Sequence, residues 1–414
     1  MIAIFGLGFV GLASALAFAE KGFQVTGYDK DPERTALLSS GKLPFHEPGL
    51  DDALTRHLGN NFNVVDNPVD AMKDAEVVYL CVGTPQGDDG AADLSILLNT
   101  IELALAGQLK DRFRVLVTKS TIPPGTTSEK VAPLVESLGW RIGLDIGIAN
   151  NPEFLREGSA WLDVFTDDRI VIGVEDEHSA KILEKLYADF GAPVSIVSWN
   201  TGEFVKYISN TLFATLISYA NDASRIADAI GGIDIKRAFS VLHKDKRWFG
   251  DPCNVATHYV YPGCGFGGYC LPKDVAALLA QGQAKGYNSP MLAATLQVNQ
   301  EIKEYVTERV IRRAVKGKPI GILGLSFKDG SDDVRETPAK AIIEMLLAQG
   351  FDIVAHDPIA NDVFQKEYPN IPITCYDTID EVIEQAGITV ILTAWNEFKA
   401  ASEHPSVIDF RYVR

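Results

Sequence analysis

The stretch IAIFGLGFVGLASALAFAEKG, residues 2–22, decides the fold. Its first residues are apolar and β-prone, and Gly6, Gly8 and Gly11 then form the pattern G-x-G-x-x-G before a helix-forming run. Glycines at this spacing permit a tight turn and let backbone N–H groups approach a pyrophosphate at the helix N-terminus. The stretch predicts a strand, a turn and a helix that bind a dinucleotide; the alternative is tight helix packing without a ligand.

An acidic residue specifies the kind of dinucleotide. Asp29 ends the next apolar run, FQVTGYD, 21 residues after Gly8. A carboxylate at this position accepts hydrogen bonds from an adenosine ribose, and it repels the 2′-phosphate that distinguishes NADP. We therefore expect the cofactor to be NAD.

The rest of the chain alternates between strand and helix patterns. Continuous apolar runs predict buried parallel strands at IAIFGL, FQVTGYD, NFNVV, EVVYLCV, RVLVTKS, RIVIGV and APVSIVS. Residues 201 to about 231 predict one long helix, two further helices follow, and a second α/β pattern begins at Pro319. We predict an α/β protein with two doubly wound Rossmann-like domains (1–198 and 317–414) joined by a helical middle (199–316) that contains a long connecting helix.

Composition excludes several kinds of partner. The formal net charge of −17 argues against binding to nucleic acid or to an anionic membrane. The five cysteines form no C-x-x-C pair and the seven histidines show no metal-ligand spacing, so we expect a reducing compartment and no metal. Because the apolar N-terminus has no basic leader, we expect no signal peptide and no membrane span, and a cytoplasmic protein.

The glycine-rich stretch YPGCGFGGYCLPKD, residues 261–274, contains a candidate nucleophile. Cys270 precedes Pro272, which suits the first turn of a helix, and a thiol near a helix N-terminus tends to have its thiolate favoured. Asp274 lies four residues on and is expected to share the helical face with Cys270. The alternative is that Cys270 is a small buried apolar residue.

Polar side chains recur on one face of the long helix. At about 100° per residue, Glu203, Lys206, Asn210 and Asn221 fall within an arc of about 60°. A solvated stripe is one interpretation. The other is a buried polar face that lines a site, where Lys206 stabilises an alkoxide and Asn210 fixes a water or hydroxyl.

Further candidates end strands at the carboxyl edge of the first predicted sheet, where ligands of doubly wound folds bind. Glu153 and Glu157 in NPEFLREG form a carboxylate pair suited to acid and base duties, or else an exposed pair beside Arg156. Thr84 in VGTP and Thr121 in KSTIPPG are expected to contact the cofactor or a reacting water.

Two cations follow the first strand of the last domain. Lys328 and Arg335 lie in GLSFKDGSDDVRETP, where cations at the carboxyl end of a strand suit a diphosphate. The alternative is that they form ion pairs with Asp332 and Asp333.

Taken together, these segments resemble the UDP-glucose/GDP-mannose dehydrogenase family over nearly the whole chain. The shared motifs occur in the order GLGFVG, VGTP, KSTIPPGTT, NPEFLREG, the helix from Lys206 to Asn221, GFGGYCLPKD and GLSFKDGSDDVRETP. The resemblance implies an NAD domain, a helical dimerisation middle and a nucleotide-sugar domain, so we expect a homodimer or a higher homo-oligomer. The helix has Asn221-Asp222 where the family usually carries Asn-Glu, and the loop HKDKRWFGDPCNVATHYVYPGCG is longer than usual.

The resemblance also implies roles for individual residues. The catalytic set comprises Cys270 as nucleophile with Lys206, Asn210, Asp274, Glu153, Glu157 and Thr121. The cofactor set comprises Gly6, Gly8, Phe9, Val10, Gly11, Asp29, Lys30, Thr84, Thr121, Glu157, Lys273 and Arg335. The substrate set comprises Glu153, Phe154, Leu155, Arg156, Lys206, Asn210, Arg247, Tyr259, Gly263, Phe266, Gly267, Phe327 and Lys328, with Arg247 matching an arginine that reaches the substrate across the dimer.

The implied activity is an NAD-dependent, four-electron oxidation of a nucleotide-hexose at C6 to the uronic acid, through a thiohemiacetal and a thioester on Cys270. UDP-glucose is the expected substrate, with GDP-mannose or a UDP-N-acetylhexosamine as alternatives. A two-electron hydroxyacid dehydrogenase is a rival enzyme class, but it needs neither a nucleophilic cysteine nor a second α/β domain. A catalytically silent sensor of nucleotide-sugar or NAD is the rival from another class.

Overall fold

The computed structural model describes residues 1–87, 90–245 and 261–411. The chain divides into two compact units, Met1–Ile208 and Ser209–Arg414, and the division falls inside the long helix α9 (Trp199–Ile230). Among the described residues, each unit contains one β-sheet. The domain boundaries at 198 and 316 stay a prediction.

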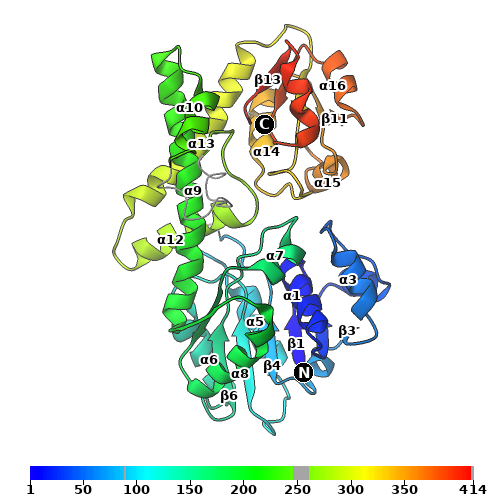
Figure 1. Ribbon diagram of the computed structural model, residues 1–414, viewed down its shortest axis with the longest axis vertical. Helices are drawn as coiled ribbons and strands as arrows, with labels where there is room; N and C mark the ends of the chain where they lie inside the picture. Colours follow the sequence, from blue (N-terminus) through cyan, green and yellow to red (C-terminus); the bar gives the residue numbers. More distant parts are fainter. Residues whose placement is uncertain (88–89, 246–260, 412–414) are drawn as a thin grey trace. The chain divides into compact units, whose positions relative to one another are not determined.

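The first unit is built on a sheet that, in the described part of the chain, has eight strands in the order β3-β2-β1-β4-β5-β6-β7-β8 (Figure 1). The order reverses between β1 and β4, which makes the end of β1 the switch point where doubly wound folds bind ligands. The strands are β1 (Ile2–Phe5), β2 (Val25–Tyr28), β3 (Phe62–Val65), β4 (Val77–Leu80), β5 (Arg114–Thr118), β6 (Ile146–Asn150), β7 (Ile170–Val174) and β8 (Val194–Val197).

The direction predicted for the last two strands is wrong. β7 pairs antiparallel with β6, and β8 is parallel to β7, so both run against the first six strands. A continuous apolar run indicates burial on both faces but carries no information about direction. β8 is also an edge strand with Ser195 and Ile196 exposed, so its predicted burial is wrong as well.

Helices cover both faces of this sheet because its strands are apolar on both sides. In β1, Ile2 and Ile4 pack with α1, while Ala3 and Phe5 belong to the cluster that contains α4 and α5. The first face is covered by α1 (Phe9–Glu20), α2 (Pro32–Ser39), α3 (Leu50–His57), α7 (Ala160–Thr166) and α8 (Glu177–Tyr187). The second is covered by α4 (Pro68–Met72), α5 (Ser95–Leu105) and α6 (Ala132–Ser137).

The second unit contains, among the described residues, a five-stranded parallel sheet in the order β11-β10-β9-β12-β13. Its strands are β9 (Ile320–Leu323), β10 (Ile353–His356), β11 (Ile373–Cys375), β12 (Ile388–Ile391) and β13 (Val407–Asp409). The flanking helices are α14 (Pro338–Ala348), α15 (Asn361–Glu367) and α16 (Ile379–Gln385). The predicted architecture of two doubly wound units and a long connecting helix is thus confirmed.

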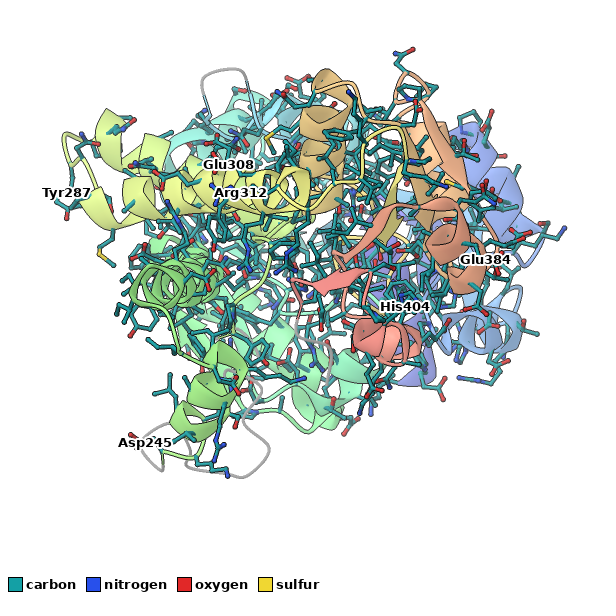
Figure 2. All side chains as sticks on the ribbon, turned by 90° about the horizontal axis from the view of Figure 1, so that it is seen from above. Asp245, Tyr287, Glu308, Arg312, Glu384 and His404 are labelled. Carbon is teal, nitrogen blue, oxygen red and sulfur yellow. The ribbon has the colours of Figure 1, made fainter. Side chains whose placement is uncertain are left out.

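In the described part of the second unit, the helices that follow α9 include α10 (Ile235–Leu242), α12 (Cys270–Ala284) and α13 (Pro290–Ile311). α13 begins with a Ser289 cap followed by Pro290, and α14 repeats this arrangement with Thr337 and Pro338. Such pairs start a helix because the cap side chain accepts a backbone N–H and proline needs none. Figure 2 shows Tyr287 at the outer end of the α12–α13 turn, with Glu308 near the far end of α13 and Arg312 directly after that helix.

We predict that Gly6→Ala destabilises the protein far more than Gly22→Ala. Both glycines have a left-handed backbone, with φ of +94° and +85°, so alanine costs each about 1 kcal/mol or more. A Cβ at Gly6 would also lie 2.6 Å from the Cys81 carbonyl oxygen, whereas a Cβ at Gly22 meets nothing within 4 Å. The expected total for Gly6→Ala is about 3 kcal/mol or more.

Thermal unfolding of the two purified variants measures this difference. Equal melting temperatures would show that the turn after β1 yields to the added methyl group instead of resisting it.

Candidate active site

The turn between β1 and α1 is closed toward the sheet and open at Gly8. A Cβ on Gly11 would lie 1.8 Å from the Gly6 carbonyl oxygen, so α1 packs directly on the turn. A Cβ on Gly8 would meet nothing within 4 Å. That open space fits a pyrophosphate at the N-terminus of α1, and Phe9 and Val10 form the first turn of this helix.

Asp29 follows β2 and lies next to this turn. Its carboxylate accepts hydrogen bonds from the Leu7 N–H at 2.7 Å and the Asp31 N–H at 3.0 Å, and Arg34 pairs with it at 2.9 Å. A carboxylate has about four acceptor positions, so Asp29 can still accept from a ribose hydroxyl. Lys30 follows Asp29 and is exposed.

Thr84 and Thr121 follow β4 and β5, which are neighbours in the sheet. The Thr84 hydroxyl donates to the Thr121 carbonyl at 2.8 Å and so ties the two strand ends together. Glu203 of α9 fixes the same loop by accepting from the Gly125 N–H at 2.6 Å and from the Thr127 N–H at 2.7 Å. Burial raises the pKa of Glu203, and the hydrogen bonds from Thr127 oppose this shift.

A buried ion pair joins the segment after β6 to α9. The Lys206 ammonium lies 3.0 Å from Glu153 Oε1, with side-chain exposures of 5% and 7%. Glu153 Oε2 accepts from the Leu155 N–H at 2.7 Å, and the Lys206 ammonium lies 5.4 Å from the centre of the Phe154 ring. Breaking one partner of such a buried pair is costly, so the charges hold each other in place.

This burial decides between the interpretations of the polar residues. Glu203, Lys206, Asn210 and Asn221 are each at most 8% exposed, so the solvated stripe is excluded for them. Glu153 does not belong to an exposed carboxylate pair either, because it is buried against Lys206. Residues 151–156 contain no helical turn, so the spacing of Glu153 and Glu157 does not place them on one helical face.

In the second unit, Asp274 is fully buried between two hydrogen-bond donors. Asn210 Nδ2 donates to Asp274 Oδ2 at 2.6 Å, and the Lys273 ammonium lies 2.6 Å from Asp274 Oδ1. Asp274 is therefore held as a carboxylate acceptor by a neutral amide and a cation. Because Lys206 and Asn210 are one turn apart on α9, the helix carries both predicted catalytic groups on one face.

Cys270 is exposed and is the first residue of α12. The glycine-rich segment before it is pinned by buried amides: Asn221 Oδ1 accepts from the Gly263 N–H at 2.7 Å, and Asn299 Oδ1 accepts from the Phe266 N–H at 2.8 Å. The exposure excludes the interpretation of Cys270 as a buried apolar residue. It leaves the thiol accessible at a helix N-terminus, where a thiolate is favoured.

Close backbone packing joins this segment to residues after β9. A Cβ on Gly267 would lie 2.4 Å from the Glu336 carbonyl oxygen, and one on Gly268 would lie 2.9 Å from the Phe327 ring. Arg335 forms the ion pair with Asp333 that was the alternative to ligand binding, at 2.9 and 2.7 Å. The Lys328 ammonium lies 5.6 Å from the centre of the Phe327 ring.

The remaining predicted residues fall in several places. Glu157 follows β6 and is partly exposed, and the Arg156 side chain pairs with Asp163 at 2.6 Å. Arg247 and Tyr259 lie outside the described residues.

In the described parts of the chain, no three His, Cys, Asp or Glu side chains are grouped to hold a metal. No described helix combines the length and hydropathy that a membrane crossing requires.

The sequence motifs did not identify two positioning residues, Asn151 and Asn299. Asn151 fixes the segment that carries Glu153, since Nδ2 donates to the Val171 carbonyl at 2.8 Å and Oδ1 accepts from Lys119 at 3.0 Å. Asn299 binds the Phe266 backbone through both N–H and C=O. The available signal for Asn299 was a polar residue among the apolar positions of a helix.

The open turn at Gly8 and the acceptor Asp29 define the class of the protein, an NAD-binding protein of the Rossmann type. Models of the UDP-glucose/GDP-mannose dehydrogenase family match its NAD binding domain to residues 1–191, its central domain to 200–301 and its UDP binding domain to 321–414. The chain belongs to this family. Its activity is that of a nucleotide-sugar 6-dehydrogenase, so the hydroxyacid dehydrogenase alternative is excluded.

Individual relatives span nearly the whole chain. UDP-glucose 6-dehydrogenase of Pseudomonas aeruginosa is 36% identical over 416 residues, covering 96% of this chain and 88% of that protein. GDP-mannose 6-dehydrogenase of the same organism is 32% identical over 407 residues, covering 94% and 90%. The structure of a UDP-glucose dehydrogenase from Pyrobaculum islandicum matches with a TM-score of 0.93 and 35% identity, covering 100% and 94%.

We predict that Gly8→Ala weakens NAD binding at least about tenfold without lowering stability, because the methyl group occupies the space open to the pyrophosphate. Calorimetric titration with NAD measures the affinity, and thermal unfolding without cofactor measures the stability. Gly22→Ala, which lies at the other end of α1, is the control and should keep the affinity. Unchanged binding by Gly8→Ala would place the pyrophosphate elsewhere.

Proposed function

We propose that the protein oxidises UDP-glucose at C6 to the uronic acid in two oxidation steps, with Cys270 as covalent nucleophile. The observation that supports this most is the accessible Cys270 at the start of α12, in the same unit as the buried set Asn210, Lys273 and Asp274. A two-electron oxidation of an alcohol needs no such thiol. UDP-glucose is preferred because relatives named for it match this chain in sequence and in structure.

In the proposed first step, the C6 hydroxyl loses its proton and the carbon loses a hydride. Lys206, which Glu153 holds in place at 3.0 Å, stabilises the developing alkoxide, and Asn210 and Asp274 orient the hydroxyl or a water that carries its proton. NAD+, when bound, would accept one hydride in each of the two oxidation steps. Gly6, Gly8, Gly11 and Asp29 are the residues proposed to hold it.

In the proposed second step, Cys270 adds to the aldehyde carbon as a thiolate and forms a thiohemiacetal. Loss of a second hydride from that carbon leaves a thioester, which a water then hydrolyses. Glu153, Glu157 and Thr121 are proposed to position and activate this water. Covalent capture by Cys270 explains why the aldehyde is not released between the steps.

Both oxidations are proposed to use the cofactor site of the first unit, because the equivalent place in the second unit is closed. Asp357 follows β10 as Asp29 follows β2, and Gly324 has φ +99° as Gly6 has +94°. The Asp357 carboxylate, however, accepts from six donors in Leu325, Ser326, Ile359, Ala360 and Trp395. No acceptor position remains on it for a ribose hydroxyl.

The proposal has alternatives that simple assays separate. GDP-mannose is favoured as a second substrate by the 32% identical relative named for it, and UDP-N-acetylhexosamines complete the panel. NADH formation with each purified nucleotide-sugar ranks them. A protein that binds these compounds but forms no NADH with any of them would be the catalytically silent sensor.

We predict two NADH per sugar consumed and no free aldehyde, because Cys270 retains the carbon until hydrolysis. Cys270→Ser is expected to lower uronate formation at least about 100-fold while NAD binding stays intact, since a hydroxyl is a far poorer nucleophile. Endpoint absorbance gives the ratio, and an added amine traps any aldehyde. The control is Cys375→Ser, which replaces a partly buried thiol on β11 whose pKa burial raises to about 11.

A ratio of one NADH per sugar with trapped aldehyde would overturn the four-electron oxidation. Wild-type uronate formation by Cys270→Ser would overturn the covalent step while leaving the substrate assignment standing.

We propose that a second copy of the chain binds along α9. Six apolar side chains are each at least 43% exposed there and fall within an arc of about 80°, nearly opposite the buried polar face: Phe204, Ile208, Leu212, Tyr219, Ile226 and Ile230. A stripe of this kind on one helix is self-complementary under two-fold symmetry, as a homodimer interface requires.

We predict that Tyr219→Glu converts the dimer to monomers, because it places a charge in the middle of this stripe. Tyr287→Glu is the matched control, since Tyr287 is as exposed at 65% against 61% but lies in the α12–α13 turn (Figure 2). Light scattering during size-exclusion chromatography gives the mass of each variant. A monomeric wild type, or an unchanged mass for Tyr219→Glu, would contradict the proposed interface.

A further inference from the structure

A small pocket lies within the first unit behind the segment that carries Glu153. Its volume is about 40 Å³, and its polar lining includes Ser14 of α1, Lys119 after β5, Glu153 after β6, and Asp167 and Arg169 between α7 and β7. Ser14, Lys119 and Glu153 are buried, with exposures of 4%, 8% and 7%. Asp167 and Arg169 are partly exposed. The polar lining therefore runs from partly exposed to buried residues.

Two buried side chains in this pocket have hydrogen-bonding capacity beyond what their neighbours use. The Ser14 hydroxyl has no partner among the described residues. The Lys119 ammonium donates to Asn151 Oδ1 at 3.0 Å, and an ammonium has three protons to donate. Buried polar groups are normally satisfied by protein or by water, and a volume of about 40 Å³ holds roughly three waters.

The pocket joins Glu153 to an acid at the surface. Glu153 Oε1 faces Lys206 and Oε2 accepts from the Leu155 N–H, and the same side chain contributes to the pocket wall. Burial and the neighbouring Asp168 charge raise the pKa of Asp167, and a hydrogen bond from the Arg169 backbone together with the Arg169 and Lys119 charges partly opposes this shift. Asp167 is thus a carboxylate that takes up a proton more readily than a fully solvated one.

We propose that this pocket is a water-filled passage that supplies the hydrolytic water to Glu153 and carries the released proton to solvent at Asp167. The inference rests on the proposed function of Glu153 in thioester hydrolysis. It adds Ser14, Lys119 and Asp167 as positioning residues, which act through water rather than on the sugar.

The passage accounts for one water and one proton in each turnover. Glu153 takes a proton from the attacking water, the new C–O bond forms at the thioester carbon, and the C–S bond breaks to release the Cys270 thiolate. The acid product loses its proton to that thiolate, which restores the thiol. Glu153 then passes its own proton through the pocket water to Asp167 and to solvent, and it is a carboxylate again. No oxidant or reductant takes part in this half of the reaction.

The test compares two adjacent acids, Asp167→Asn and Asp168→Asn. Asp168 is exposed, pairs with Arg169 at 2.6 Å and does not line the pocket. In single turnovers of the complete enzyme with NAD+ and UDP-glucose, absorbance follows NADH, and intact-protein mass follows the acyl adduct on Cys270. We expect Asp167→Asn to slow decay of the adduct roughly tenfold with NADH formation unchanged. Asp168→Asn removes a charge that raises the pKa of Asp167 but keeps the pocket carboxylate, so it should slow the decay far less.

Two further comparisons separate proton transfer from a loss of structure. Millimolar imidazole, a small proton carrier, should restore adduct decay in Asp167→Asn, which a merely structural defect would not allow. Ser14→Val and Ser14→Thr have the same shape, but only threonine keeps a hydroxyl, so adduct decay should be slower in the valine variant.

Equal decay in Asp167→Asn and Asp168→Asn, or in the two Ser14 variants, would overturn the passage while the covalent mechanism stands. Normal uronate formation without any acyl adduct, in the wild type and in every variant, would instead overturn the covalent mechanism and the passage with it.

Discussion

Backbone contact at the end of β1 is the constraint on which the first unit depends. α1 approaches the turn so closely that a side chain on Gly11 would overlap the Gly6 carbonyl. Gly6 itself packs against the carbonyl of Cys81, directly after β4. This contact brings the start of α1 to the place where the strand order reverses. The ends of β4, β5 and β6 are then lined up beside it by the parallel ladder, which gathers Thr84, Thr121 and Glu153 at one edge.

The second unit uses the same turn for a different purpose. Gly324, Leu325 and Asp357 repeat the backbone geometry of Gly6, Leu7 and Asp29, down to the amide that donates to the carboxylate. In the first unit the carboxylate keeps an acceptor position, and in the second it is saturated by protein groups. One fold thus serves once as a binding edge for a dinucleotide and once as a rigid support for the segment that carries Phe327, Lys328 and Arg335.

Much of this arrangement could be predicted from the sequence, because long periodic segments carry strong signals. The β1–α1 turn, the helix from Trp199 and the buried polar face on it follow from glycine spacing and from the period of 3.6 residues. The direction of β7 could not be predicted, because an apolar run looks the same in either direction. β11 and β13 could not be predicted as strands, because each is only three residues long. The partners of Glu203 and Asn299 are distant in sequence, so no local pattern reveals them.

Helix α9 has a buried polar face and an exposed apolar stripe that are nearly opposite each other. This arrangement restricts how the sequence of α9 can change. Inserting or deleting one residue between Lys206 and Tyr219 would turn everything beyond it by about 100° and shift it by about 1.5 Å along the axis. Asn221 and the other buried residues beyond the change would then lose their phase with Lys206, and the apolar stripe would be broken at the same point. Substitutions between the two faces of α9 are open to natural variation, whereas a change in its length is not, so related chains should differ in length in the loops that flank α9 rather than within it.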